Sequence, residues 1–196
     1  WPQGVGLYGL LKMMKIQGND DYKTFLHQWF KGNIADGLPS RNINTTTPLL
    51  TLAELNEQYQ DKEFENLCLD WASWLMNCIP RTKEGGFQHV TSANGDRQGV
   101  RLNESEMWID TLFMTVLFLN KMGQKYQKQE WIDESIHQVL MHIKYLYDTH
   151  TDYSITDGPL TVWIISAVFS GAEETAGSHW EFWTMWICSK EHSMQV

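Results

Sequence analysis

The chain has 196 residues, a formal net charge of −9 and 13% aromatic residues. The negative charge argues against a nucleic-acid binder, which needs a basic face, and no apolar run reaches the roughly 20 residues of a membrane span. Cys68, Cys78 and Cys188 match no zinc-binding spacing, and an odd, sparse set of cysteines predicts reduced thiols. The length has room for one ordinary domain.

The first 30 residues predict a helical hairpin. Segment 5–16 is rich in apolar residues and predicts a first helix, and Gly18 lies in a polar turn that ends it. Apolar residues then recur at the spacing of one helical face, namely Tyr22, Phe25, Leu26, Trp29 and Phe30. They predict a second, amphipathic helix, joined to the first by a short turn.

The next 50 residues predict a polar loop and a second hairpin. The loop covers residues 32–47. Thr47 and Pro48 have the form of an N-cap and a first helical residue, so we expect a short helix over residues 49–58. Apolar spacing predicts a longer helix over residues 62–77, which Pro80 ends.

A third hairpin is predicted after a long loop over residues 81–102, of a length that is usually functional or disordered in a compact domain. Asn103 and Glu106 have the form of a capping box, which predicts the start of a helix that Gly123 ends. Another helix is predicted over residues 131–148, and no stretch before Thr151 is typical of a strand. Inner-type helices that are apolar all round alternate with outer-type helices, which predicts an all-α ring or solenoid of hairpins.

Asp110 is the titratable residue that the pattern singles out. It lies in a run of large apolar side chains between Met107 and Leu119, and a helix that is apolar all round is a buried helix. Burial raises the pKa of a carboxyl group, which suits a general acid near neutral pH. The alternative is an aspartate hydrogen-bonded to a neighbouring helix end. Composition alone favours this alternative, because buried polar groups are usually satisfied.

Four segments, in order, resemble the unsaturated rhamnogalacturonyl hydrolases of glycoside hydrolase family 105, which are related to the unsaturated glucuronyl hydrolases. They are residues 1–11, the Asn-Ile-Asn-Thr-Thr-Thr-Pro of 42–48, the Gly-Gly-Phe-Gln-His of 85–89 and the Trp-Ile-Asp-Thr-Leu-Phe-Met of 108–114. The resemblance covers residues 1–151 and implies an (α/α)6 barrel of helical hairpins, here incomplete with about three hairpins.

The resemblance also implies a reaction on pectin fragments. The substrate is a rhamnogalacturonan oligosaccharide with a 4,5-unsaturated uronic acid at its non-reducing end. In the family, the aspartate that matches Asp110 donates a proton to C4 of the double bond and then activates the water that adds at C5. The spaced carboxylate pair of ordinary glycosidases is not required for this hydration. No metal and no cofactor are expected.

The matching motifs imply substrate-binding residues beside Asp110. Trp108 would stack on the sugar, with core packing as the alternative. His89 matches a loop histidine, and Gly85 and Gly86 would let the backbone approach the ligand.

Two further candidates and two exclusions complete the predicted site. Asn44 stands near the place where many family members have a second acidic residue, so its amide could bind sugar but could not share a proton. Met114 could line the pocket, with core packing as the alternative. Glu106 is interpreted as a helix-cap residue, and His142 as a residue of an outer helix that is not a ligand.

The resemblance stops at Thr151, where the family should continue with Gly-Leu-Phe-Tyr-His-Gly-Trp. If the third base of each codon is read with the first two bases of the next, residues 151–161 can encode Gly-Leu-Phe-Tyr-His-Gly-Trp-Thr-Phe-Asp. The hypothesis is that one base was lost near the Thr151 codon and that residues 152–196 are an out-of-frame tail. The alternative is a divergent C-terminus. A half-barrel followed by such a tail predicts impaired activity.

The sequence leaves alternative functions open, and it gives only expectations for the partner and the cellular location. A non-catalytic helical-hairpin scaffold fits the hairpin pattern, and an unsaturated glucuronyl hydrolase acting on glycosaminoglycan fragments fits the resemblance. The expected partner is an unsaturated uronyl oligosaccharide, with neither nucleic acid nor membrane, and a cytoplasmic location is expected. The chain begins with Trp1 rather than Met, so we expect a fragment from which a signal peptide could have been lost. The oligomeric state is open.

Overall fold

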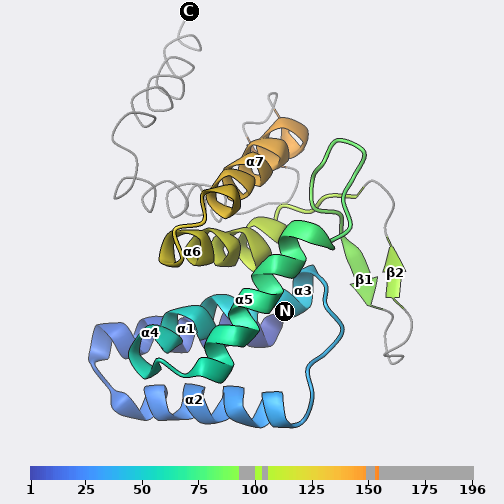
Figure 1. Cartoon of the computed structure of the whole chain (residues 1–196). Coiled ribbons are helices and arrows are strands. Elements are labelled where there is room, and N and C mark those ends of the chain that lie inside the picture. Colours follow the sequence, from blue (N-terminus) through green and yellow to red (C-terminus); the bar gives the residue numbers. More distant parts are fainter. Residues whose placement is uncertain (93–99, 103–105, 149–152, 155–196) are drawn as a thin grey trace, which may run out of the picture.

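The computed structural model of the chain describes residues 1–92, 100–102, 106–148 and 153–154, which are mostly helical (Figure 1). The helices are α1 (Pro2–Gln17), α2 (Asp20–Ala35), α3 (Ile43–Thr46), α4 (Pro48–Tyr59), α5 (Lys62–Asn77), the π-helical turn η1 (Leu112–Val116), α6 (Leu117–Lys125) and α7 (Gln129–Leu146). The strands are β1 (Val90–Ser92), β2 (Val100–Leu102), β3 (Tyr147–Asp148) and β4 (Tyr153–Ser154).

The long helices of this part of the chain form three hairpins, α1–α2, α4–α5 and α6–α7 (Figure 1). Helix α4 packs against both α1 and α6, so these three helices make an inner row. The outer helices bridge the hairpins, because α2 packs on α1 and α4, and α5 packs on α4 and α6. The predicted all-α class and the alternation of inner and outer helices are confirmed.

Local signals in the sequence set the hairpin turns. Gly18 adopts a left-handed conformation with φ 64° after α1, and its N–H donates to the carbonyl of Met14 at 2.8 Å. The side chains of Asn19 and Asp61 cap α2 and α5 by accepting the N–H two residues on, each at 2.8 Å. Such caps satisfy backbone groups that a helix end leaves unpaired, which is why the helix bounds follow the sequence closely here.

Helix α4 lies at the centre of the packed helices. Every residue from Leu49 to Asn56 is buried, because α1, α5 and α6 surround the helix. Completely buried side chains from both sets of helices pack in this core, among them Leu11 and Phe118 of the inner row and Leu26 and Phe64 of the outer helices. A helix that is mostly apolar and has no exposed face over this stretch is stable only in such a position.

Helix α1 lies at one end of the inner row and leaves apolar side chains in solvent. Leu7, Leu11 and Met14 face the core, whereas Val5, Met13 and Ile16 are exposed. An exposed apolar surface of this kind favours association.

The prediction that no strand precedes Thr151 is wrong. β1 pairs with β2 in antiparallel fashion, with Val90 opposite Leu102, and β3 pairs with β4 (Figure 1). Strands of two or three residues are too short to show the alternation of polar and apolar residues that identifies a strand in sequence.

The predicted start of the third inner helix is also wrong. Glu106 is not helical, and the helix begins only after Asp110, with η1. The reason is a backbone pairing, because the His89 N–H donates to the Glu106 carbonyl at 2.8 Å and keeps that segment extended. Asn103, the other half of the predicted capping box, lies outside the described residues.

A capping box does occur earlier, inside the predicted polar loop. Asn42 and Thr45 bond reciprocally through side chain and backbone, at 2.9 and 3.0 Å, and form the start of α3. Four helical residues with Asn or Thr at three of the positions give no periodic pattern, so the sequence predicts only a loop.

No helix of the described part is both long and apolar enough to cross a bilayer. Apart from β4, the predicted tail of residues 152–196 lies outside the described residues.

Candidate active site

His89, Trp108 and Asp110 lie close together at the start of η1. The imidazole of His89 stacks on the indole of Trp108 with centroids 3.8 Å apart. The His89 and Asp110 side chains interact electrostatically, and each shifts the pKa of the other. Only Thr111 separates Asp110 from the π-helical turn, and π-helical turns are frequent at functional sites.

The structure changes the position of Asp110 within its element. The sequence predicts it inside a buried helix, but it lies in the turn before η1, where its carbonyl accepts the Met114 N–H at 3.0 Å. Its side chain is only half-buried, yet its Oδ1 atom is buried and has no hydrogen-bond partner among the described residues.

Burial raises the pKa of Asp110, as the sequence predicts. The His89 ring and the backbone N–H groups of Thr111 and Asp110 act in the opposite direction. An aspartate held only by a neighbouring helix end, the structural alternative, would leave no buried oxygen without a partner. The unpaired Oδ1 therefore favours the chemical role over the structural one.

His89 is only 2% exposed, and burial lowers its pKa. The nearby carboxyl groups of Asp110 and Glu106 act in the opposite direction. Its Nδ1 is buried and has no hydrogen-bond partner among the described residues. A neutral imidazole and a carboxyl group of raised pKa, each with an unpaired buried atom, form a polar pair that can bind and protonate a ligand.

Trp108 combines an exposed ring with a fixed orientation. It is 40% exposed, which is high for an aromatic residue that packs in a core. One face of the indole lies against His89, and Nε1–H donates to the Glu106 carboxylate at 3.2 Å. Glu106, interpreted from the sequence as a helix cap, therefore holds a residue of the site.

The two glycines before His89 are explained by the backbone conformation and the packing of the protein itself. Gly85 has φ 96°, a conformation that favours glycine. At Gly86, an added Cβ would lie 1.9 Å from Met107 Sδ. The sequence predicts approach of a ligand to these glycines, but the structure places the Met107 side chain against Gly86 instead.

The other two predicted residues are less closely linked to the site. Asn44 is half-buried on α3, which packs against η1, but no described interaction joins its side chain to Asp110. Met114 is buried in the hydrophobic core, the alternative that the sequence left open.

Two residues of α7, Gln138 and His142, pack against the segments of the site. The sequence pattern did not single out Gln138, and it excluded His142 as a ligand. Gln138 is completely buried and binds the backbone of the segment that carries His89. His142, one turn further on, is also completely buried, and its Nδ1 lies 2.7 Å from the Gln138 carbonyl. Burial lowers the pKa of His142, whereas the carbonyl groups of Gln138 and Trp108 act in the opposite direction. Their i, i+4 spacing on the apolar face of the predicted helix is a signal that could have found them.

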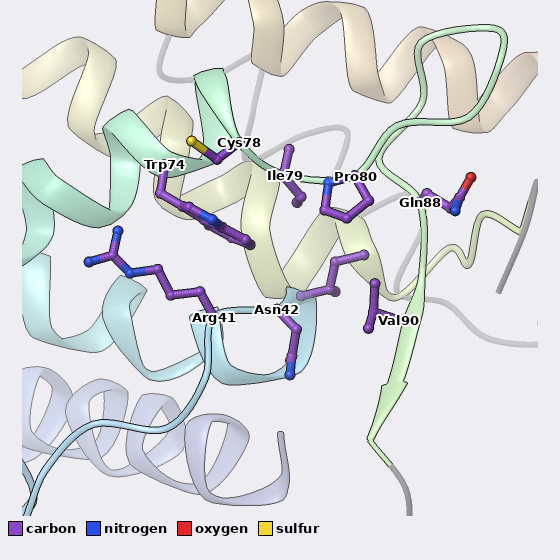
Figure 2. A pocket seen from close by; sticks show the side chains of 9 residues that line it. Arg41, Asn42, Trp74, Cys78, Ile79, Pro80, Gln88 and Val90 are labelled. Atoms are coloured by element: carbon purple, nitrogen blue, oxygen red, sulfur yellow. The ribbon is translucent and has the colours of Figure 1, made fainter. Parts of the chain in front are cut away.

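A cavity of about 290 Å³ lies beside the segment that carries His89, between α3, the end of α5 and β1 (Figure 2). Gln88 and Val90 line it, and in an extended chain they point away from the side of His89. Arg41 in its wall pairs with Asp70. None of the predicted site residues lines the cavity, so it is distinct from the candidate active site.

A family comparison matches this architecture. The family model described as Glycosyl Hydrolase Family 88 matches residues 1–157, and the chain belongs to this family. The chain is also 27% identical over 152 residues to the unsaturated rhamnogalacturonyl hydrolase YesR of Bacillus subtilis (strain 168). That match covers 78% of this chain and 43% of YesR.

Two crystal structures have the same fold. Each is of a possible member of the GH105 family, one from Klebsiella pneumoniae subsp. pneumoniae and one from Salmonella enterica subsp. enterica serovar Paratyphi A. The TM-scores are 0.72 and 0.71, with 36% and 37% identity, and each match covers 77% of this chain and 38% of the other. The three hairpins are thus part of an (α/α)6 barrel, and the chain spans about two fifths of the length of these relatives.

Proposed function

We propose that the barrel to which this chain contributes removes a 4,5-unsaturated uronic acid from rhamnogalacturonan oligosaccharides, with Asp110 as the general acid. The observation that supports this most is that the Oδ1 atom of Asp110 is buried without a hydrogen-bond partner among the described residues, while burial raises the pKa of the carboxyl group. The name of YesR, an unsaturated rhamnogalacturonyl hydrolase, supports the substrate class.

The reaction needs only one carboxyl group, used twice. Protonated Asp110 donates its proton to C4 of the enol ether, and positive charge develops at C5, shared with the ring oxygen. The resulting carboxylate then takes a proton from the water that adds at C5. The hemiketal opens, the bond to the neighbouring sugar breaks, and Asp110 is protonated again as at the start. A raised pKa supports the first of these steps, because the acid must hold its proton near neutral pH.

The neighbouring residues bind and orient the sugar. The exposed ring of Trp108 stacks on the apolar face of the uronic acid, and buried His89 hydrogen-bonds to its polar groups. Asn44 binds the same sugar from α3, which packs against η1. In this chain we propose that turnover is impaired, because the described part of the chain forms only three of the hairpins of the barrel. The cytoplasmic location stays a prediction.

The test uses the purified chain and an unsaturated rhamnogalacturonan disaccharide. Binding is followed by tryptophan fluorescence, and turnover by loss of the ultraviolet absorbance of the double bond. Asp110→Asn should retain binding and remove whatever turnover the chain has, since general acids contribute about 10²–10⁴-fold. Asp133→Asn on the exposed face of α7 is the matched control. Measurable turnover that is equal in both variants would contradict the role of Asp110, and absence of both binding and turnover would favour the scaffold function.

A second candidate substrate is an unsaturated glucuronyl unit on a glycosaminoglycan fragment. The match to the Glycosyl Hydrolase Family 88 model supports retaining this second substrate as a candidate. Binding measured side by side for the two disaccharides separates the candidates, and tighter binding of the glycosaminoglycan fragment would overturn the rhamnogalacturonan assignment.

A further inference from the structure

The side chain of Gln138 binds a loop as a neighbouring strand would. Its Oε1 accepts the Phe87 N–H at 2.8 Å, and its Nε2 donates to the Gly85 carbonyl at 2.9 Å. Gln138 lies on α7 and is completely buried; its bond to Phe87 is buried and its bond to Gly85 is partly buried. A buried amide with both ends paired is costly to remove, because its partners are then left unsatisfied.

The orientation of this amide is determined by an ion pair. Glu134, one turn earlier on α7, accepts a second bond from Gln138 Nε2 at 2.7 Å. Arg81 donates to the same Glu134 oxygen at 2.6 Å and to the Gly85 carbonyl at 3.2 Å. Because a carboxylate only accepts hydrogen bonds, the Gln138 nitrogen must face Glu134, and its oxygen must then face the Phe87 N–H.

The loop held by Gln138 leads directly to His89. Three consecutive backbone N–H groups in it bind three different parts of the chain. Phe87 binds the Gln138 side chain, Gln88 donates to the Pro80 carbonyl at 2.9 Å, and His89 donates to the Glu106 carbonyl at 2.8 Å. Of these three N–H groups, only that of Phe87 binds a side chain; the other two bind backbone carbonyl groups.

We propose that Gln138 is a positioning residue for His89. By holding residues 85–87 against α7, it keeps the imidazole stacked on Trp108 and beside Asp110. The functional meaning rests on the proposed role of His89 in sugar binding. The positional effect can be measured without any turnover.

The experiment replaces Gln138 in the full 196-residue chain. Gln138→Met keeps the length of the side chain and removes all of its hydrogen bonds. The readouts are NMR titration of the His89 ring and the nuclear Overhauser effect between the His89 and Trp108 rings. We expect the pKa of His89 to rise toward its ordinary value of about 6.5 as burial is lost, and the ring-to-ring signal to weaken.

The matched control is Gln124→Met on α6. It removes a glutamine side-chain bond of 2.8 Å to Asn120 and touches no residue of the loop, so His89 should titrate as in the wild type. A folded Gln138→Met chain with unchanged His89 titration and unchanged ring contact overturns the proposal.

A second variant covers the case in which Gln138→Met does not fold. Glu134→Gln keeps the shape of its side chain and removes only the carboxylate that orients the Gln138 amide. We expect a smaller change of the His89 titration in the same direction, and no change overturns the proposal. A negative result in the Asp110→Asn turnover test would contradict the proposed reaction but not the positioning role of Gln138. The two proposals can therefore be tested independently.

Discussion

The imidazole of His89 lies parallel to the indole of Trp108, with an interplanar angle of 2° and centroids 3.8 Å apart. The two rings come from segments that pair through the His89 N–H and the Glu106 carbonyl. This backbone pairing is what brings the loop that contains His89 against the turn that contains Asp110. The stacked pair therefore joins the two halves of the candidate site.

Replacing Trp108 tests the importance of this stack. Trp108→Leu removes the aromatic contact, which is worth about 0.5–1.5 kcal/mol beyond burial, and we expect a decrease of that size in the free energy of unfolding, together with weaker sugar binding. Trp108→Phe keeps a ring and should recover part of both. Urea unfolding and fluorescence titration with the disaccharide provide the measurements. Trp1→Leu, at an exposed position, is the control and should change neither.

The pH dependence of stability tests the environment of Asp110. Its folded-state pKa is raised above its ordinary value of 3.8, so the folded chain holds this proton to higher pH than the unfolded chain does. Stability therefore falls as pH rises from about 3.8 through the folded-state pKa, and the loss stays constant above it. Asparagine is neutral throughout this range.

We therefore expect Asp110→Asn to unfold at higher urea concentration than the wild type at pH 7.5. The gain should shrink toward zero near pH 4. Urea midpoints measured at both pH values check this. A variant that is less stable than the wild type at pH 7.5 would mean that Asp110 has a structural hydrogen-bonding role.

The sequence predicts the helices better than the site, for a physical reason. Helix bounds such as those of α5 depend on local signals, a capping Asp61 and a following Pro80, and these are visible along the chain. The position of Asp110 depends on a pairing between residues 89 and 106, which are distant in sequence. Apolar residues continue on the N-terminal side of Asp110, so periodicity predicts a helix that begins before it. Periodicity contains no information about the pairing between residues 89 and 106. Asp110 itself was identified by the family motif and its apolar surroundings.

The same limit applies to Gln138. A polar residue on the apolar face of a predicted helix has no partner in the sequence alone, since its partners lie 51 and 53 residues away. The motif of residues 85–89 is visible, but the residue that holds it becomes clear only in the folded chain.

The close approach at Gly86 makes a prediction about stability. Gly86→Ala places a methyl group 1.9 Å from Met107 Sδ, so Met107 must shift, and Trp108 follows it directly. We expect a loss of about 1–3 kcal/mol, typical of overpacking. Gly9→Ala, in an exposed part of α1 with nothing within 4 Å of the new methyl group, is the matched control. It should gain about 1 kcal/mol from helix propensity, and equal effects at the two sites in urea unfolding would count against the packing explanation.

The last prediction concerns the reading frame after Thr151. A Gly-Leu-Phe-Tyr-His-Gly-Trp sequence can be encoded one base out of frame from residue 151 onward. We expect resequencing of the encoding DNA across this codon to find one additional base. Expression from the restored frame should then give a longer chain with more hairpins, higher turnover and less exposed apolar surface on α1. Asp110→Asn in that protein should abolish turnover while sugar binding is retained. An unchanged frame would instead mean that the chain is a genuine product with a divergent C-terminus, and the three-hairpin chain would then be the form in which binding and turnover must be measured.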